Sequence, residues 1–332
     1  MPPEWDVHER TWMSWPSGSY TLGDTEADAL EARQAWAGVA NAIVKYEPLT
    51  MVVNPGDEDV ARSFLDPRAD IVSAPLDDAW MRDNGPTFVR TAEGSVAAVT
   101  WVFNGWGACD WASWENDSKI GKFVAGQSGA PVIDSPMINE GGGIHVNGAG
   151  VILVTETVQR GDGRNSDWSR EQVEAELNRT LGTTRTIWLE RGLTKDYSGF
   201  GTRGHVDIVA CFANENTVLV HDQRNQSHPD YAVSQEVLAQ MRSEGFNVIA
   251  VPAPDRLLDD ESDPESWCDY SYINHYICNG AVILCAFDDP GDERAAAILR
   301  EAYPGREIVL VDALPLFARG GGIHCITQQQ PR

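Results

Sequence analysis

The chain has 332 residues, 42% of them hydrophobic, and its 50 acidic and 25 basic residues give a formal net charge of −25. Such acidity argues against a nucleic acid or an anionic membrane as the partner, because both require a basic surface, whereas a small cationic substrate would be attracted. No apolar run approaches the ~18 residues of a membrane span, and the N-terminus lacks the layout of a signal peptide, so we expect a cytoplasmic protein.

The first half of the chain contains two groups of predicted elements. In the first group, apolar periodicity predicts a strand at residues 11–15, a long helix at 24–46 and a strand at 49–53. The second group begins with a hairpin at residues 86–101 and continues with a short helix at 117–127 and a strand at 131–134.

The second half repeats one pattern three times. An alternating strand, a short turn that contains Asn or Gly and an almost wholly apolar strand form a hairpin. These hairpins are predicted at residues 144–155, 205–220 and 272–285. A helix follows each hairpin, at residues 169–181, 233–244 and 292–303. An apolar strand ends each unit, at residues 186–189, 247–251 and 307–311. The ββαβ unit therefore recurs every ~55 residues.

The first group lacks one hairpin strand, and the end of the chain can supply it. Ile323, Cys325 and Thr327 alternate with His324 and Ile326, which is the spacing of a strand at residues 323–327. Placed beside residues 11–15, this strand completes a fifth unit and closes a ring. The predicted fold is an α/β, five-bladed propeller of pseudo-fivefold ββαβ repeats, closed by the C-terminal strand, and residues 1–332 form a single domain.

Unusual polar residues lie just before or within the first hairpin strand of the units. They are Asp83, Glu140, His205, Asp207 and Cys325. Equivalent positions around a ring face its axis, so we expect these side chains to share one pocket. His205 and Asp207 are two residues apart, and on a strand they would face the same side of an otherwise apolar run.

Each candidate also has a structural alternative. Asp83 precedes Asn-Gly-Pro and could form a turn, while Glu140 precedes three glycines and could be a charge on a surface loop. Trp80 could pack in the core rather than line a pocket, and Cys325 could be a small buried hydrophobe. We interpret three further histidines as structural residues: His145, His275 and His324.

The cysteines and histidines do not form a recognisable metal site. Six cysteines are present, but no Cys-x-x-Cys pair and no His-Glu-x-x-His motif occur, and the seven histidines are scattered. We therefore predict no zinc site. In a chain of this length without an export signal we expect no dependence on disulfide bonds.

A thiol, an imidazole and several carboxylates in one pocket suit a planar cation that offers several N–H donors. Carboxylates bind a guanidinium bidentately, so Asp83 and Asp207 would hold it and fix its central carbon for attack. The Cys325 thiolate would add to that carbon, and His205 would protonate the nitrogen that leaves as ammonia. Water deprotonated by His205 would then expel the thiolate and leave a urea group. Glu140 would either orient His205 or contact the guanidinium, and no metal or organic cofactor is required.

Six segments carry a resemblance that spans nearly the whole chain. They are residues 2–16 (PPEWDVHERTWMSWP), 80–86 (WMRDNGP), 140–146 (EGGGIHV), 204–207 (GHVD), 271–274 (SYIN) and 320–329 (GGGIHCITQQ). They resemble successive motifs of the agmatine deiminase and bacterial-type peptidylarginine deiminase family, which belongs to the guanidine-modifying superfamily with the pentein fold. By this resemblance Cys325 matches the nucleophile and His205 the acid and base. Glu140 matches the carboxylate associated with the histidine, Asp83 and Asp207 the guanidinium-binding aspartates, and Trp80 a tryptophan of the substrate pocket.

The family resemblance implies the conversion of agmatine to N-carbamoylputrescine and ammonia, in putrescine biosynthesis, often by a homo-oligomer. The chain departs from the family pattern at residues 201–208, where Arg203 places a cation two residues from His205. If Arg203 faces the pocket it would suit a substrate with a carboxylate, such as free arginine, and it could equally point away into an ion pair. Deimination of arginine, peptidyl arginine or another alkylguanidine, and transfer of the amidino group to an amine, therefore stay open. So does a pentein that binds a partner without catalysis.

Overall fold

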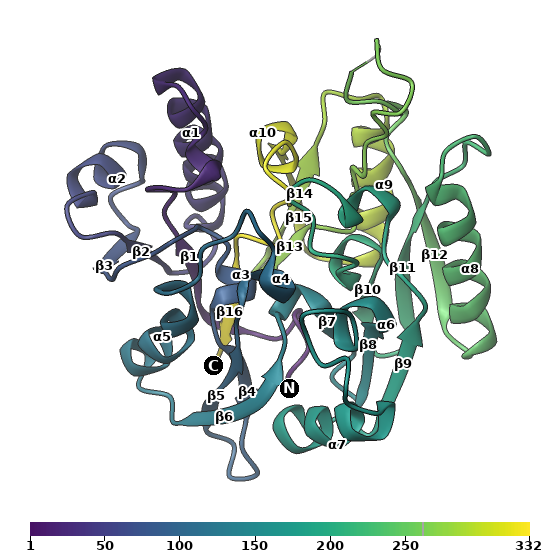
Figure 1. Ribbon diagram of the computed structural model, residues 1–332, viewed down its shortest axis with the longest axis horizontal. Helices are drawn as coiled ribbons and strands as arrows, with labels where there is room; N and C mark the ends of the chain where they lie inside the picture. Colours follow the sequence, from purple (N-terminus) through teal and green to yellow (C-terminus); the bar gives the residue numbers. More distant parts are fainter. Residues whose placement is uncertain (261) are drawn as a thin grey trace.

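The computed structural model describes residues 1–260 and 262–332 and forms an α/β fold of five separate mixed sheets (Figure 1). The sheets lie around the middle of the molecule and the longer helices lie outside them (Figure 1). Both ends of the chain lie near the middle (Figure 1). Within residues 1–260 and 262–332, no helix has the length and apolar character needed to cross a membrane.

Four of the sheets are built alike, with an antiparallel pair of strands followed by a parallel third strand. Their strands are β4 (Thr87–Arg90), β5 (Val96–Val102) and β6 (Val132–Ile138); β7 (Ile144–Val146), β8 (Val151–Thr155) and β9 (Arg185–Leu189); β10 (Ala210–Asn214), β11 (Thr217–Asp222) and β12 (Asn247–Pro252); and β13 (Tyr276–Cys278), β14 (Ala281–Ala286) and β15 (Glu307–Asp312). A helix joins the second strand of each sheet to the third: α5 (Ile120–Ser128), α7 (Arg170–Leu181), α8 (Asp230–Ser243) and α9 (Gly291–Ala302). These elements confirm the predicted ββαβ units.

The remaining sheet joins the two ends of the chain. Its strands are β16 (Gln328–Pro331), β1 (His8–Ser14), β2 (Leu49–Val53) and β3 (Asp70–Ser73), in that order. β16 pairs antiparallel with β1, and Trp12 lies opposite Gln328. The expectation that the C-terminal segment completes the first unit is therefore confirmed. The sequence analysis missed β3 and the preceding α2 (Glu58–Phe64), which are short and mostly not buried.

The predicted strand at residues 323–327 is wrong in its limits, because these residues form a turn and the strand begins at Gln328. The Thr327 hydroxyl donates to the carbonyl oxygens of Ile323 (2.9 Å) and His324 (3.1 Å), so those oxygens are bound within the turn rather than across a sheet. Alternating residue types therefore indicated a strand where local side-chain hydrogen bonds favour a turn.

The predicted hairpins at 205–220 and 272–285 also begin later than expected. Residues Val206–Ile208 form a single 3₁₀ turn, and β13 starts only at Tyr276. The backbone N–H groups of Gly204 and His205 donate to the carboxylate of Asp196, at 2.6 and 3.0 Å. These bonds occupy the donors that a sheet would use, so His205 and Asp207 lie on a turn and not on one face of a strand.

Helix termini follow from the local sequence. The helix α1 (Glu26–Ile43) begins with a reciprocal capping box between Thr25 and Asp28, and α7 begins with the same arrangement between Ser169 and Gln172. Each box satisfies N–H groups that have no partner inside the helix. α7 ends at Gly182, whose φ of 70° is costly for residues with a Cβ. The short helices are α3 (Met81–Asn84), α4 (Gly105–Ala108), α6 (Glu156–Gln159) and α10 (Leu314–Phe317).

Candidate active site

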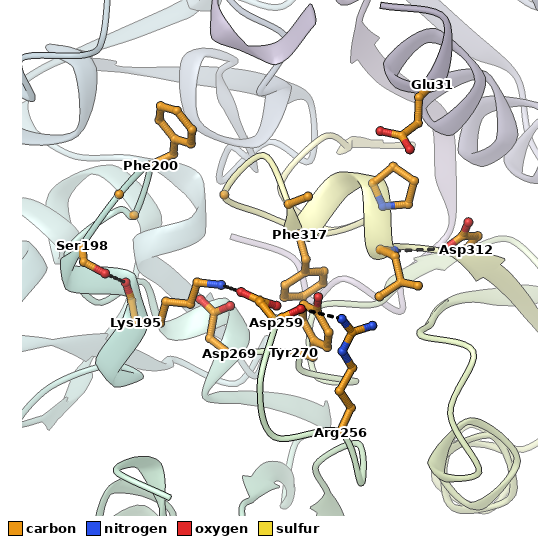
Figure 2. Close-up of a pocket in the computed structure, with 16 residues that line it drawn as sticks. Glu31, Lys195, Ser198, Phe200, Arg256, Asp259, Asp269, Tyr270, Asp312 and Phe317 are labelled. Atoms are coloured by element: carbon orange, nitrogen blue, oxygen red, sulfur yellow. Dashed lines mark hydrogen bonds and ion pairs between the residues drawn. The ribbon is translucent and has the colours of Figure 1, made fainter. Parts of the chain in front are cut away.

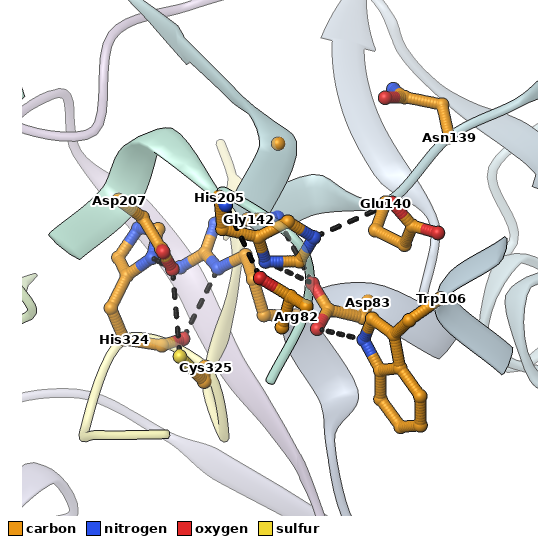
Figure 3. Close-up of polar contacts among 12 residues, drawn as sticks. Arg82, Asp83, Trp106, Asn139, Glu140, Gly142, His205, Asp207, His324 and Cys325 are labelled. Carbon is orange, nitrogen blue, oxygen red and sulfur yellow. Dashed lines mark hydrogen bonds and ion pairs between the residues drawn. The ribbon is translucent and has the colours of Figure 1, made fainter. Parts of the chain in front are cut away.

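Loops and turns at the start of the units bring the sequence candidates together (Figure 3). Asp83 lies in α3, and Glu140 immediately precedes a 3₁₀ turn at Gly141–Gly143. His205 immediately precedes a second 3₁₀ turn, Val206–Ile208, and Asp207 lies within it. Cys325 lies in the turn before β16. Each of these five side chains belongs to a residue that is no more than 5% exposed.

Cys325 is held beside a carboxylate and an amide. Its Sγ lies 3.6 Å from Asp207 Oδ2 and 3.3 Å from Asn274 Nδ2, while its carbonyl accepts a hydrogen bond of 3.1 Å from the Arg82 N–H. Burial, followed by the negative charges of Asp207 and Asp83, raises the pKa of the Cys325 thiol well above its usual value. The thiol is therefore neutral at pH 7.

His205 lies between two carboxylates. Its Nε2 is 3.4 Å from Glu140 Oε2, and its Nδ1 is 3.9 Å from Asp83 Oδ1. Burial would lower the pKa of His205, but Asp83 and Glu140 outweigh it and raise the pKa to about 9. The imidazole is therefore protonated at neutral pH, and its Nδ1 has no hydrogen-bond partner among the described residues. A Cβ at Gly142 would lie 2.5 Å from that Nδ1, so only glycine allows this approach.

Asp83 and Asp207 are buried carboxylates with different partners. Asp83 accepts hydrogen bonds from Trp106 Nε1 (2.9 Å) and from the Gly142 N–H (3.0 Å), and burial raises its pKa. Asp207 Oδ2 lies 2.8 Å from His324 Nδ1. Burial would raise the pKa of Asp207, but the hydrogen bond and positive charge of His324 outweigh it and lower the pKa. Asp207 Oδ1 is buried with no partner among the described residues, so it can accept a donor from a ligand.

Glu140 forms a buried ion pair with Arg164, a residue that the sequence analysis did not identify. Arg164 Nε lies 3.0 Å from both Glu140 oxygens, and its Nη2 donates to the Thr202 carbonyl at 2.7 Å. Burial would raise the pKa of Glu140, but Arg164 and His205 outweigh it and lower the pKa. Arg164 lies in the polar loop between α6 and α7, outside the hairpins, so no local pattern indicated its place in the site.

A small cavity and a wider one meet at this site. The small cavity is bordered by Cys325, His205 and Asp207. The wider one is shown in Figure 2. The two share three bordering residues: Asp269, Phe317 and Gly320. The wider cavity therefore adjoins the small cavity at Cys325.

Comparison with known proteins places the chain in a family. The family model described as Porphyromonas-type peptidyl-arginine deiminase matches residues 1–331. The chain belongs to this family. It is 36% identical over 358 residues to an agmatine deiminase of Pseudomonas fluorescens, and the match covers 100% of this chain and 95% of that protein. It is 57% identical over 338 residues to a Streptomyces coelicolor protein provisionally named an agmatine deiminase, with 100% and 98% covered.

Solved structures of the family share the fold. The agmatine deiminase of Enterococcus faecalis superposes with a TM-score of 0.91 at 28% identity, covering 100% of this chain and 95% of that one. The agmatine deiminase of C. jejuni with substrate bound superposes with a TM-score of 0.87 at 23% identity, covering 99% and 95%. The family resemblance identified from the sequence motifs is therefore confirmed.

Two further residues that the sequence analysis considered, Trp80 and Arg203, border neither cavity. Trp80 is buried and donates from Nε1 to the Tyr20 hydroxyl at 2.9 Å, and the edge of its ring meets Trp36. It belongs to the main hydrophobic core and borders neither cavity, and a Cβ on Gly321 would lie 2.7 Å from its ring and 3.1 Å from Cys325 Sγ. Arg203 donates to the carbonyls of Gly107 (3.1 Å) and Asp162 (3.0 Å) and borders neither cavity. Among the described residues it forms no ion pair.

The sequence analysis also did not predict the residues that hold the Asp207 carboxylate in place. His324, interpreted as structural, bonds Asp207 through Nδ1 and Glu4 through Nε2, at 2.8 and 2.9 Å. Glu4 also pairs with Arg82 at 3.3 Å. Glu4 and His324 both lie in segments that carried the family resemblance, but their contact joins the two ends of the chain, which the sequence alone does not place together.

Proposed function

We propose that this protein is an agmatine deiminase, which hydrolyses the guanidinium of agmatine to N-carbamoylputrescine and ammonia through a covalent adduct on Cys325. The observation that carries this proposal is the juxtaposition of Cys325 Sγ with Asp207, whose buried Oδ1 has no partner among the described residues. A buried acceptor beside a thiol needs a ligand that brings both a donor and a positive charge. The curated relatives named agmatine deiminases support the same activity.

In the proposed complex, the guanidinium lies between Asp83 and Asp207. Each carboxylate accepts N–H groups from one edge of the planar cation, which fixes the central carbon beside Cys325. The cation also offsets the negative charges that raise the thiol's pKa. Binding of the substrate therefore favours release of the thiol proton to water, since His205 already holds a proton, and the thiolate forms only when the carbon that it attacks is in place.

The first half-reaction breaks one C–N bond. The Cys325 thiolate adds to the central carbon, and protonated His205 gives its proton to one NH₂ group, which leaves as ammonia. We assign the transfer to His205 Nδ1, because Nε2 faces Glu140 while Nδ1 has no partner among the described residues. The product of this step is a thiouronium cation bonded to Cys325, still held by the two aspartates.

The second half-reaction uses water. Neutral His205 removes a proton from a water molecule, the resulting hydroxide adds to the same carbon, and the C–S bond breaks to return the thiolate and a urea group. Glu140 serves to orient His205 rather than to contact the substrate, an assignment supported by its contacts with Nε2 of His205 and with Arg164. Trp80 itself borders neither cavity, and its ring packs against Gly321, which borders the small one, so Trp80 supports the pocket wall from behind.

We also propose that residues 1–332 form one domain, a pseudo-fivefold propeller closed by the pairing of β16 with β1. The support is the common strand order of four sheets and the completion of the fifth by the C-terminal strand. The homo-oligomer and the cytoplasmic location stay predictions.

The proposed function is tested by measuring ammonia release from agmatine, arginine and 4-guanidinobutyrate. We expect agmatine to be the best substrate and the Cys325→Ala variant to be inactive on all three. Cys278→Ala is the matched control, because Cys278 is a buried thiol on β13 that borders neither cavity, and it should retain activity. Ammonia release by Cys325→Ala would contradict the nucleophile assignment.

A further inference from the structure

The passage between the two cavities is bordered by a carboxylate that the proposed reaction does not use. Asp269 is one of three residues common to both cavities, and it precedes Tyr270 on the segment that leads to Asn274. Figure 2 shows Asp269 beside Lys195 and Tyr270. A substrate with its guanidinium at Cys325 and its tail in the wider cavity would lie beside the three residues that border both cavities, Asp269 among them.

Among the described residues no cation forms an ion pair with the Asp269 carboxylate, whose hydrogen-bond donor is its own backbone N–H. Lys195, the cation next to it in Figure 2, forms its ion pair with Asp259. Within residues 1–260 and 262–332, no side chain of another residue donates a hydrogen bond to the Asp269 carboxylate. Burial, reinforced by the charges of Asp196 and Asp230 against that of Lys195, raises the pKa of Asp269 to about 7. A carboxylate in such surroundings that has no cationic partner is stabilised when a cationic ligand group reaches it.

The basic residues around the passage are already bound. Arg256 donates to the carbonyls of Leu258 (3.0 Å) and Asp259 (2.8 Å), and Arg203 is held by two other carbonyls outside both cavities. Four acidic side chains border the wider cavity against two basic ones: Glu31, Asp259, Asp269 and Asp312 against Lys195 and Arg256. A substrate carboxylate would therefore meet a net negative wall, whereas an ammonium group would be attracted.

Apolar side chains line the same route. Phe317 borders both cavities, and its ring packs edge-on against Tyr270 with 5.5 Å between the ring centroids. Such a wall suits the methylene chain between the two charged ends of a substrate, because methylene groups gain free energy by leaving water.

We propose that Asp269 determines specificity by binding a distal ammonium group, so that the substrate class of this site is alkylguanidines that carry a second cation at the other end of the chain. This inference rests on the proposed deiminase function and extends it, because the guanidinium-binding residues alone do not distinguish agmatine from other guanidines.

The test compares agmatine with n-butylguanidine, which keeps the guanidinium and the four carbons but lacks the amine. We expect the wild-type protein to prefer agmatine and Asp269→Asn to lower kcat/KM for agmatine by about 10- to 100-fold, mainly through KM, as for loss of a charged hydrogen bond. The same variant should change kcat/KM for n-butylguanidine by less than about threefold, because the guanidinium end is untouched. Asp269→Glu, which keeps the charge, should recover part of the loss.

Asp312→Asn is the matched control, because Asp312 borders the wider cavity only and uses Oδ1 to accept the Leu314 N–H at 3.0 Å. It should leave the ratio of the two substrates unchanged. Equal losses on both substrates in Asp269→Asn, or no loss on either, would overturn the assignment of Asp269. Absence of ammonia release from both substrates by the wild-type protein would instead refute the deiminase function.

A second measurement needs no variant and applies even if Asp269→Asn fails to fold. Asp269 titrates near neutrality, with Lys195, Asp196 and Asp230 as the charged groups around it. The wild-type preference for agmatine over n-butylguanidine should therefore increase between pH 6 and pH 8, as Asp269 loses its proton. The ratio cancels the titration of the catalytic groups, which both substrates share. A ratio that is constant over this range would contradict the proposal.

Discussion

Charged residues at the centre of the molecule and those on its surface are arranged very differently. At the centre, Arg164 and Glu140 have side chains with no exposed area and contact each other through two oxygens. On the outside, Arg191 pairs with Glu236 while 43% and 50% of their side chains stay exposed. Exposed pairs contribute about 0–1 kcal/mol to stability, whereas removing one partner of a buried pair costs about 3–5 kcal/mol.

The difference indicates where the chain keeps charges for a reason other than solubility. The outer acids account for much of the net charge and are individually replaceable. The central ones are costly to bury, and the fold provides specific partners for each, such as Trp106 for Asp83 and His324 for Asp207. We expect substitutions at the centre to affect catalysis or folding strongly and matched substitutions outside to do neither.

The largest effect on activity among the acids is expected at Asp207. Asp207→Asn removes the negative charge that faces both the guanidinium and Cys325 Sγ, so kcat/KM for agmatine should fall by about 1000-fold, as for loss of a preorganised electrostatic contact. Steady-state ammonia release measures it. Glu236→Gln, an exposed acid on α8, is the control and should keep wild-type activity. Wild-type activity in Asp207→Asn would show that the guanidinium does not bind at Asp207.

The next effect concerns stability and compares the two ion pairs directly. Arg164→Met should lower the free energy of unfolding by about 3–5 kcal/mol, because Glu140 stays buried without its cation. Arg191→Met should lower it by less than about 1 kcal/mol. Denaturant unfolding of both variants provides the comparison. Similar losses in the two variants would show that burial does not separate these pairs.

The pH dependence of kcat should report the titration of His205. The pKa of His205 is raised to about 9, so the proton that it donates is present below that pH and is lost as the pH rises through it. Therefore kcat for agmatine should fall about tenfold per pH unit above about 9. The same sign holds for stability, since the charged form of His205 stabilises the fold below its unfolded pKa and ceases to do so as the pH passes the folded one. A kcat that stays constant to pH 10 would contradict the role of His205.

The smallest effect is expected at Arg203, which lies next to the site in sequence but faces away from it. Arg203→Met should change kcat/KM for agmatine by less than about threefold, because the guanidinium contacts only two backbone carbonyls outside the cavities. It should not increase activity on arginine. A large change in the ratio of kcat/KM for agmatine to kcat/KM for arginine would show that Arg203 contributes to substrate specificity.

The sequence predicted best those parts of the fold whose apolar pattern continues over a whole element. The helices α7, α8 and α9 and the buried strands after them lie within a few residues of their predicted limits. Prediction failed at residues 205–209 and 323–327, where side chains such as Asp196 and Thr327 bind the backbone and replace sheet pairing. Those side-chain bonds depend on contacts that periodicity does not report.

The same distinction holds for the site. The five central candidates, Asp83, Glu140, His205, Asp207 and Cys325, were found because each is a polar residue at an equivalent position of a repeated unit. Arg164 has no such position, and His324 acts through a contact with Glu4 across the full length of the chain. Asp269 was not predicted, because it is identified only by its position on the border of both cavities.

The crystal structure of the Cys325→Ala variant with bound agmatine is the most direct measurement. We expect the guanidinium plane between Asp83 and Asp207, its central carbon facing residue 325, and the amine directed past Phe317 toward Asp269. An agmatine bound in the reverse orientation, or with its guanidinium outside the small cavity, would contradict the account of how this centre holds a cation for attack.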